Sequence, residues 1–154
     1  MNKINQKKMK KILIIGLSTS LLLILLAFVF SEYANAESFK AKYIKNYDGD
    51  TITVKLDCNT PLFCNKMSIR VNGVDTPEIR ANCPKEKRLA VKAKEFVKQN
   101  LNNKLIELRN CKKGKYFRLI CDVFYDYRTN LSSKLIINGY GRKYDGGKRK
   151  NWCK

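Results

Sequence analysis

The 154-residue chain contains no histidine, and this absence excludes several kinds of chemistry. Catalytic triads and dyads that use an imidazole base are excluded. Zinc, haem and non-haem iron sites that need imidazole ligands are excluded as well. An enzyme of this composition must draw its chemistry from carboxylates, arginine, lysine, tyrosine, cysteine or a bound cation.

Acidic residues are scarce too, with 13 against 32 basic residues and a formal net charge of +19. Such a charge suits a polyanionic partner, above all nucleic acid. Solubility or adhesion to an anionic surface would explain the same composition, so charge alone does not choose between them. Internal repeats, low-complexity stretches and linkers rich in proline or glycine are absent, which favours one folded domain.

Residues 1–36 are expected to form a signal peptide. Five lysines precede an apolar run at residues 12–30, and the small-residue motif Ala34-Asn35-Ala36 follows. This order is typical of an exported protein that is cleaved after Ala36. The alternative is an uncleaved anchor, because the apolar run is long enough to span a bilayer. The first reading predicts a secreted or periplasmic bacterial protein, and the second a protein held on the outer face of the membrane by residues 12–30.

The cysteine pattern agrees with export. The count is even, and no cysteine lies in the leader, as in small exported domains that carry disulfides. A four-thiolate metal site is the alternative, but the chain has no Cys-x-x-Cys pair. The spacing alone leaves the pairing open among Cys58, Cys64, Cys83, Cys111, Cys121 and Cys153.

Hydrophobic periodicity predicts three strands, a helix, two strands and a second helix in residues 37–154. Pro84 suits the first position of the first helix, and Asn130 suits the N-cap of the second, which Gly139 would end. Five short strands with an inserted helix predict an α+β fold built on a five-stranded barrel of the OB type. The expected strands are residues 39–47, 51–56, 67–71, 104–109 and 116–125, the helices are 84–101 and 130–138, and residues 142–154 are expected to have little regular structure.

Three short segments carry the candidate chemistry: residues 48–51 (Asp-Gly-Asp-Thr), residues 70–78 and residues 115–118. An Asp-Gly-Asp run alone most often marks a turn, and a lone arginine or aspartate is most often a solvated charge. Together, the three segments would supply what phosphodiester cleavage needs. These are a group that activates or orients the attacking water and positive charge that neutralises the phosphate oxygens.

The residue types assign candidate roles. Asp50 and Asp75 offer hard oxygen ligands that suit Ca²⁺ or Mg²⁺. Glu78 is the candidate for handling the attacking water, because the chain has no histidine. The planar forks of Arg70 and Arg118 suit two phosphate oxygens at once.

In order and spacing, these segments resemble the staphylococcal nuclease (thermonuclease) family, and the likeness runs from about residue 42 to residue 144. The resemblance implies a five-stranded OB barrel with packed helices in residues 37–154. It also implies Ca²⁺-dependent hydrolysis of DNA and RNA that leaves 3′-phosphate and 5′-hydroxyl ends.

The family's metal ligands map onto Asp50, Asp75 and the backbone carbonyl of Thr76, with Asp48 behind them. The resemblance makes Glu78 the general base or the residue that orients the water.

It makes Arg70 and Arg118 the groups that bind the scissile phosphate and stabilise the transition state. Lys115 and Tyr116 would contact the neighbouring phosphate and nucleotide.

The chain also departs from the family. Phe117 stands where a glycine often precedes the second catalytic arginine, and the chain ends soon after Tyr144, without the long C-terminal helix of the best-known member. We expect a disulfide between Cys83 and Cys153 to compensate by tying the tail to the loop after Glu78.

The remaining cysteines are less clearly paired. Cys58 and Cys64 are an easy second pair across a hairpin loop. Cys111 and Cys121 are left over, and a pairing between them stays open, although the expected hairpin register does not place them opposite each other.

Two other functions fit the composition. One is a nucleic-acid-binding OB module without catalysis, and the other is an exported basic factor that binds membranes or wall polymers. The first would lack the acidic and arginine residues that this chain retains, and the second gives no reason for carboxylates at these positions. We therefore predict a secreted nuclease, monomeric by default, with the preference between DNA and RNA left open.

Overall fold

The computed structural model describes residue 24 and residues 38–56, 66–115 and 118–154. The expected Cys58–Cys64 pair, Tyr116 and Phe117 lie outside these residues. The chain divides into two compact units, residues 1–36 and 37–154, and the elements below belong to the second. Within the described residues, no helix is both long and apolar enough to cross a membrane.

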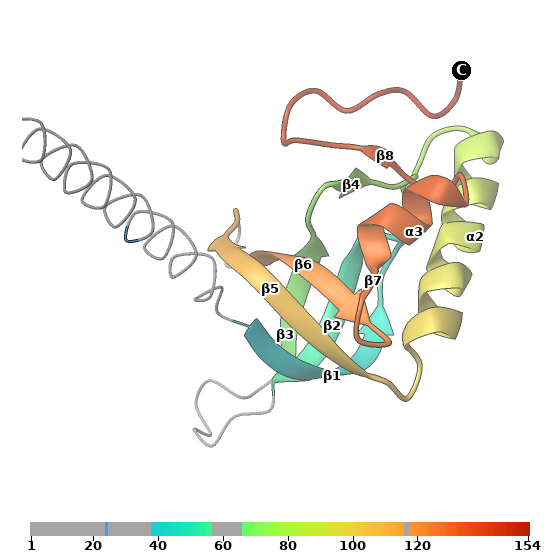
Figure 1. Ribbon diagram of the computed structural model, residues 1–154. Coiled ribbons are helices and arrows are strands. Elements are labelled where there is room, and N and C mark those ends of the chain that lie inside the picture. Colours follow the sequence, from blue (N-terminus) through green and yellow to red (C-terminus); the bar gives the residue numbers. More distant parts are fainter. Residues whose placement is uncertain (1–23, 25–37, 57–65, 116–117) are drawn as a thin grey trace, which may run out of the picture. The chain divides into compact units, whose positions relative to one another are not determined.

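Five strands close into a barrel, which confirms the predicted OB-type α+β fold (Figure 1). Neighbouring strands pair antiparallel in the order β3-β2-β1-β5-β6. A parallel pairing of β3 with β6 closes the barrel, and β7 (Thr129–Asn130) extends the sheet beyond β6. The barrel strands are β1 (Ser38–Asn46), β2 (Thr51–Leu56), β3 (Lys66–Val71), β5 (Leu105–Lys113) and β6 (Leu119–Tyr125).

Alternate residues of the strands fill the barrel interior, as the period of two in a half-buried strand requires. In β2, for example, Ile52 and Val54 are fully buried while Lys55 is exposed. A slip of one residue would bring every such lysine inside, so this pattern specifies the register strongly. The other buried strand residues are Ala41, Tyr43, Ile69, Val71, Ile106, Leu108, Cys121, Val123 and Tyr125.

Two helices cover the barrel. Helix α2 (Pro84–Leu101) packs on β1 and has the predicted bounds. Its buried stripe consists of small and branched apolar residues spaced three or four apart, the spacing of one helix face. Helix α3 (Leu131–Ile137) packs on β6, and the side chain of Asn130 caps it by accepting a hydrogen bond from the Ser133 amide at 3.1 Å. The α2 stripe comprises Ala90, Ala93, Val97 and Leu101.

A bulge in β5 corrects one sequence-based expectation. The pairing register between β5 and β6 shifts between Arg109 and Lys112, and Asn110 adopts a positive φ of 51°. Two residues of β5 thus oppose one residue of β6, which is the arrangement of a β-bulge. The bulge brings Cys111 against Cys121, and the two form a disulfide that a regular register would not allow.

The C-terminal tail has little regular structure, as expected, apart from one two-residue strand. Strand β8 (Arg142–Lys143) pairs antiparallel with β4 (Val74–Asp75). Gly141 permits this close approach, because a Cβ there would lie 2.4 Å from a methyl group of Val74. The tail then returns toward the start of α2, where the predicted disulfide between Cys83 and Cys153 is present (Figure 1).

The two disulfides should differ in their contribution to stability. The Cys83–Cys153 bridge spans 70 residues and the Cys111–Cys121 bridge spans 10. We expect Cys83→Ala/Cys153→Ala to lower the free energy of unfolding by about 4 kcal/mol, and Cys111→Ala/Cys121→Ala by about 3 kcal/mol, from the chain-entropy relation. Guanidinium unfolding of the two double variants and the wild type measures both values. An unchanged midpoint for Cys83→Ala/Cys153→Ala would contradict a stabilising role of the tail bridge.

Candidate functional site

The turn that joins β1 to β2 positions the first acidic residues. Asp48 accepts a hydrogen bond from the Asp50 amide at 3.1 Å, which closes the turn. The amide group of Asn46 donates to the carbonyl of Asp48 at 2.7 Å and to a carbonyl of α2 at 3.0 Å. Gly49 is required there, because a Cβ would lie 2.8 Å from the methyl group of Thr76. The turn is therefore fixed tightly against both α2 and the segment after β4.

The segment after β4 brings the second set of oxygen atoms to the same place. Asp50, Asp75 and Thr76 are 1%, 2% and 1% exposed. The Thr76 amide donates to Asp50 Oδ2 at 3.0 Å, and the Val71 amide donates to the carbonyl of Asp50 at 2.8 Å. The barrel thus brings together the three residues expected to hold a metal ion.

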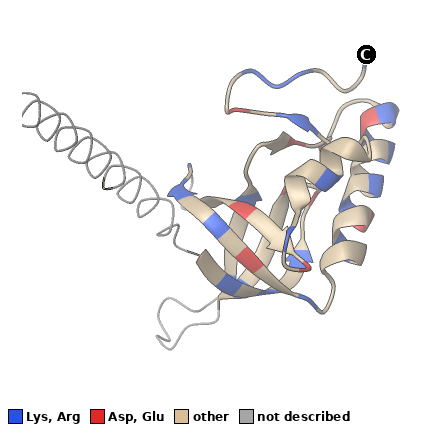
Figure 2. Cartoon of the chain, in the orientation of Figure 1, with Lys and Arg blue, Asp and Glu red and all other residues tan. Residues whose placement is uncertain are grey.

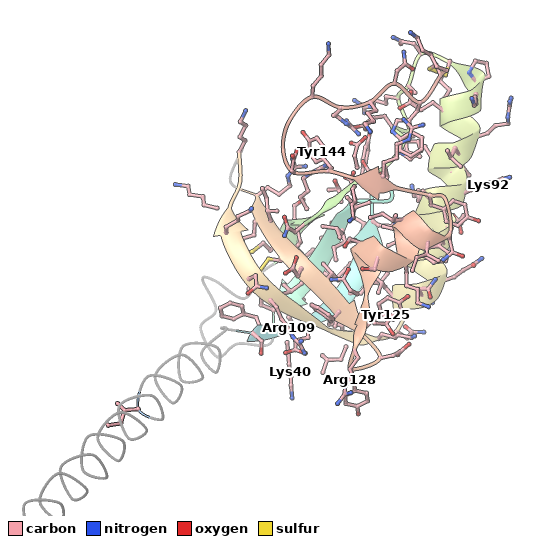
Figure 3. The ribbon with its side chains drawn as sticks, turned by 45° about the horizontal axis from the view of Figure 1, so that its top comes forward. Lys40, Lys92, Arg109, Tyr125, Arg128 and Tyr144 are labelled. Carbon is pink, nitrogen blue, oxygen red and sulfur yellow. A yellow bond between two sulfur atoms is a disulfide. The ribbon has the colours of Figure 1, made fainter. Side chains whose placement is uncertain are left out.

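Arginine side chains lie beside these carboxylates. Arg70, on β3, places its Nη1 at 2.6 Å from Asp50 Oδ1 and its Nη2 at 3.9 Å from Asp75 Oδ1. Its guanidinium lies 5.6 Å from the centre of the Tyr144 ring. Figure 3 shows Tyr144 on the tail, at the opposite end of the barrel from Lys40.

A cavity of about 380 Å³ opens over this cluster. The expected phosphate-binding residue Arg118 lines it together with Asp48, Arg70 and Glu78. The structure therefore places all of these predicted residues around one opening. Lys115 is exposed in the turn before β6, where its carbonyl accepts a hydrogen bond from the Arg118 amide at 3.4 Å.

Burial raises the pKa values of two acidic groups, Asp48 and Asp50. Burial, followed by the neighbouring charge of Asp50, raises the pKa of Asp48 to about 6 from 3.8. Burial also raises the pKa of Asp50, against the opposing influence of the Arg70 charge and the Thr76 amide. A cation near these carboxylates would favour their charged forms.

Sequence reasoning missed Arg149, which lies in the tail and contacts most of the expected metal ligands. Its Nε donates to Asp75 Oδ1, its Nη1 donates to Glu78, and its Nη2 donates to the carbonyl of Thr76 at 2.9 Å. The predicted Cys83–Cys153 pairing was the signal that could have found it, because this bridge brings the residues just before position 153 to the loop after Glu78.

Trp152 is the second missed residue. It is 6% exposed, and its indole N–H donates to Asp75 Oδ2 at 3.2 Å. The guanidinium of Arg142 stacks over its ring at 3.8 Å. Both oxygens of Asp75 are therefore held by residues of the tail.

The donor set fits a hard divalent cation. Asp50, Asp75 and the Thr76 carbonyl offer oxygen atoms only, which is the ligand type preferred by Ca²⁺ and Mg²⁺. The carboxylates of Asp50 and Asp75 are buried close together, so their negative charges repel. The guanidinium of Arg149 already donates to three oxygen-bearing groups at this place, namely Asp75, Glu78 and the Thr76 carbonyl. The arrangement can hold a cation, orient a water molecule at Glu78 and bind a phosphate at Arg70 and Arg118.

A second cavity, of about 540 Å³, lies along the tail. Its lining includes Asp75 and Tyr144, and Tyr144 also lines the first cavity. Figure 2 shows that lysine and arginine recur along the tail as well as on α2 and the strands. The basic residues that line this cavity are Arg142, Lys143, Lys148 and Lys150.

Comparisons with known proteins agree with the fold. A family model described as "Staphylococcal nuclease homologue" matches residues 68–152, which is more than half of the chain. The chain is also similar to a protein named endonuclease Htp3 from Saprolegnia parasitica (strain CBS 223.65), with 26% identity over 124 residues. That match covers 73% of this chain, and the chain spans 59% of the length of the relative.

The raised pKa of Asp48 predicts how stability depends on pH. Because the native state holds this proton more tightly than the unfolded chain, the stabilisation is fully present below about pH 4 and is lost as pH rises through about 6. In chelator, we expect a loss of about 2 to 3 kcal/mol across this range. The raised pKa of Asp50 adds to the same trend, because burial disfavours its charged form as well.

Urea unfolding at several pH values measures this loss. Asp48→Asn keeps an oxygen that accepts from the Asp50 amide but does not titrate, so it should flatten the profile. Asp126→Asn, at an exposed aspartate, is the matched control and should keep the wild-type profile. A wild-type slope in Asp48→Asn would contradict the assignment.

Proposed function

Since this chain belongs to the family of staphylococcal nuclease homologues, we propose that it is a Ca²⁺-dependent endonuclease. It hydrolyses the phosphodiester bonds of DNA and RNA and leaves 3′-phosphate and 5′-hydroxyl ends. One observation carries the proposal: two buried carboxylates and a backbone carbonyl converge beneath a cavity that Arg70, Arg118 and Glu78 line. The proposed substrate also agrees with the net charge of +19.

Asp50, Asp75 and the Thr76 carbonyl would hold the ion, and Asp48 supports them through its hydrogen bond to the Asp50 amide. When bound, Ca²⁺ supplies positive charge that stabilises the developing charge on the phosphate oxygens. The tight turn and the β4 segment hold these oxygen atoms in place before the substrate arrives, which lowers the cost of reorganisation.

The remaining roles belong to side chains at the opening. Arg70 and Arg118 bind the non-bridging phosphate oxygens and stabilise them as charge accumulates. Glu78, whose side chain is 39% exposed, accepts a proton from the attacking water or orients it. In a chain without histidine, a carboxylate at the opening is the candidate for this role.

The basic cavity along the tail extends the proposed substrate path. The cavity shares Tyr144 with the opening over the carboxylates, so a strand bound at the site can continue along Lys148 and Lys150. An OB barrel accepts unpaired bases, which favours single-stranded or breathing DNA as the substrate.

We further propose that the protein acts outside the cytoplasm as a monomer, after cleavage of the leader at Ala36. Two disulfides in a domain of this size support an oxidising compartment.

Cleavage of heat-denatured DNA tests the proposed activity. The full chain with its disulfides intact should cleave in millimolar Ca²⁺ and should be inactive in excess chelator. Glu78→Gln should lower the rate in Ca²⁺ by about a hundredfold or more, the usual contribution of a general base, while binding of DNA persists. Glu95→Gln, at an exposed glutamate of α2, is the control and should cleave at the wild-type rate.

The same experiment distinguishes a nuclease from the alternative, a nucleic-acid-binding module without catalysis. A wild-type protein that binds DNA tightly but does not cleave it in Ca²⁺, Mg²⁺ or Mn²⁺ would be a binding module. An unchanged rate in Glu78→Gln would remove Glu78 from the mechanism.

The substrate path along the tail predicts a change in salt dependence. In chelator, Lys148→Gln/Lys150→Gln should weaken binding of single-stranded DNA and reduce the slope of log K against log [salt] by about 1.4, at about 0.7 per lost phosphate contact. Fluorescence anisotropy at several salt concentrations measures the slope. Lys87→Gln/Lys92→Gln, on the exposed side of α2, removes the same charge, and an equal slope change in both would contradict a path along the tail.

A further inference from the structure

We infer that Arg149 is a tethered cation that competes with the divalent ion for the oxygen atoms of Asp75, Thr76 and Glu78, and so sets the metal affinity of the site. The inference rests on the proposed function in one respect, because it requires that a divalent cation binds to these oxygens. It adds a residue of the tail that opposes this binding.

The contacts of Arg149 support direct competition. Each of its three guanidinium nitrogens donates to a different group, namely the Asp75 carboxylate, the Glu78 carboxylate and the Thr76 carbonyl. Asp75 and the Thr76 carbonyl are two of the three groups expected to hold the ion. A donor N–H and a metal ion that use the same oxygen lone pairs repel one another, so they do not share these positions.

The charge of Arg149 is permanent. Burial by itself lowers the pKa of this guanidinium, but hydrogen bonds and charge from Glu78 and Asp75 outweigh burial and raise it. Arginine does not deprotonate in proteins, so a change of pH cannot remove this competitor by neutralising it. The guanidinium must instead move away from the oxygens.

The tail keeps Arg149 close to the site. On one side, β8 pairs with β4, whose second residue is Asp75 itself. On the other side, Cys153 is bonded to Cys83, and the buried Trp152 donates to Asp75. Position 149 lies four residues before position 153, a reach of at most about 14 Å even when fully extended. The competitor is therefore present at a high effective concentration.

The side chain can still leave without release of the tail. Its side chain is 38% exposed, and it also lines the cavity over the carboxylates. Rotation of this side chain toward that opening would free Asp75 and Thr76 while Trp152 and the disulfide stay in place. The apparent dissociation constant for the ion is the intrinsic constant divided by the fraction of molecules in which Arg149 has moved away.

Calorimetric titration of the full, oxidised chain with Ca²⁺ tests the inference. Arg149→Gln removes the charge and should bind Ca²⁺ about tenfold or more tightly than the wild type, as expected if Arg149 occupies the site in at least about nine-tenths of metal-free molecules. Arg80→Gln removes a charge from an exposed residue near Glu78 and is the matched control. It should change the affinity by less than about twofold, because solvent and salt screen exposed charges.

Thermal unfolding of the same variants separates competition from a purely structural role. In chelator, Arg149→Gln should lower the unfolding midpoint by several degrees, because it leaves the buried Asp75 carboxylate with less compensating charge. In saturating Ca²⁺ the difference from the wild type should close or reverse. A structural ion pair alone would lower the midpoint by the same amount in both conditions, and that result would overturn the inference.

The affinity results decide the remaining cases. Binding of Ca²⁺ by Arg149→Gln but not by the wild type would support the inference in its strongest form. Equal or weaker binding by Arg149→Gln would overturn it while leaving the proposed function intact. Absence of Ca²⁺ binding in both proteins would overturn the inference together with the Ca²⁺ dependence of the proposed function.

Discussion

The site depends on the cost of burying negative charge. Asp48, Asp50 and Asp75 are at most 5% exposed and lie in one cluster, and the charge of Asp50 raises the cost of ionising Asp48. Buried carboxylates persist only when hydrogen bonds and opposite charges compensate them. Backbone amides, Arg70 and Arg149 provide this compensation. Such an arrangement is costly for a structural role alone but well suited to hold a cation.

This constraint explains why the tail matters to a site formed by the barrel. The barrel supplies the turn at Gly49 and the arginine on β3, but among the described barrel residues the charged partner of Asp75 is Arg70 at 3.9 Å. The tail completes the shell around Asp75 through Arg149 and Trp152. Pairing of β8 with β4 and the Cys83–Cys153 disulfide hold the tail there. The disulfide therefore contributes to the geometry of the site as well as to stability, and the family match extends through this tail to residue 152.

Most of what could be predicted from the sequence concerned the helices and strands and their order along the chain. The bounds of β2 and α2 follow from hydrophobic periodicity and from Pro84, and the barrel follows from the order of the elements. Resemblance to a known family then identified half of the residues that line the first cavity, namely Asp48, Arg70, Glu78 and Arg118. The misses have two different physical causes, because one depends on an irregularity within a hairpin and the other on a contact between segments far apart in the chain. The Cys111–Cys121 bridge needs a bulge that no periodicity signals, and Arg149 is one basic residue among many in the tail.

The basic character of the chain has two opposing consequences at the site. Positive charge attracts a polyanionic substrate, but it also repels the divalent cation that the carboxylates would hold. The structure separates these effects in space. Arg118 and Lys148 line open cavities where phosphate can approach, whereas Arg149 donates directly to Asp75 and the Thr76 carbonyl, which we propose as metal ligands. In the absence of metal, the Arg149 guanidinium compensates the charge of the buried Asp75 carboxylate. The same contact lowers the affinity of the site for the metal ion. A bound phosphate would attract the displaced guanidinium, so substrate and metal would each favour the same movement of one side chain.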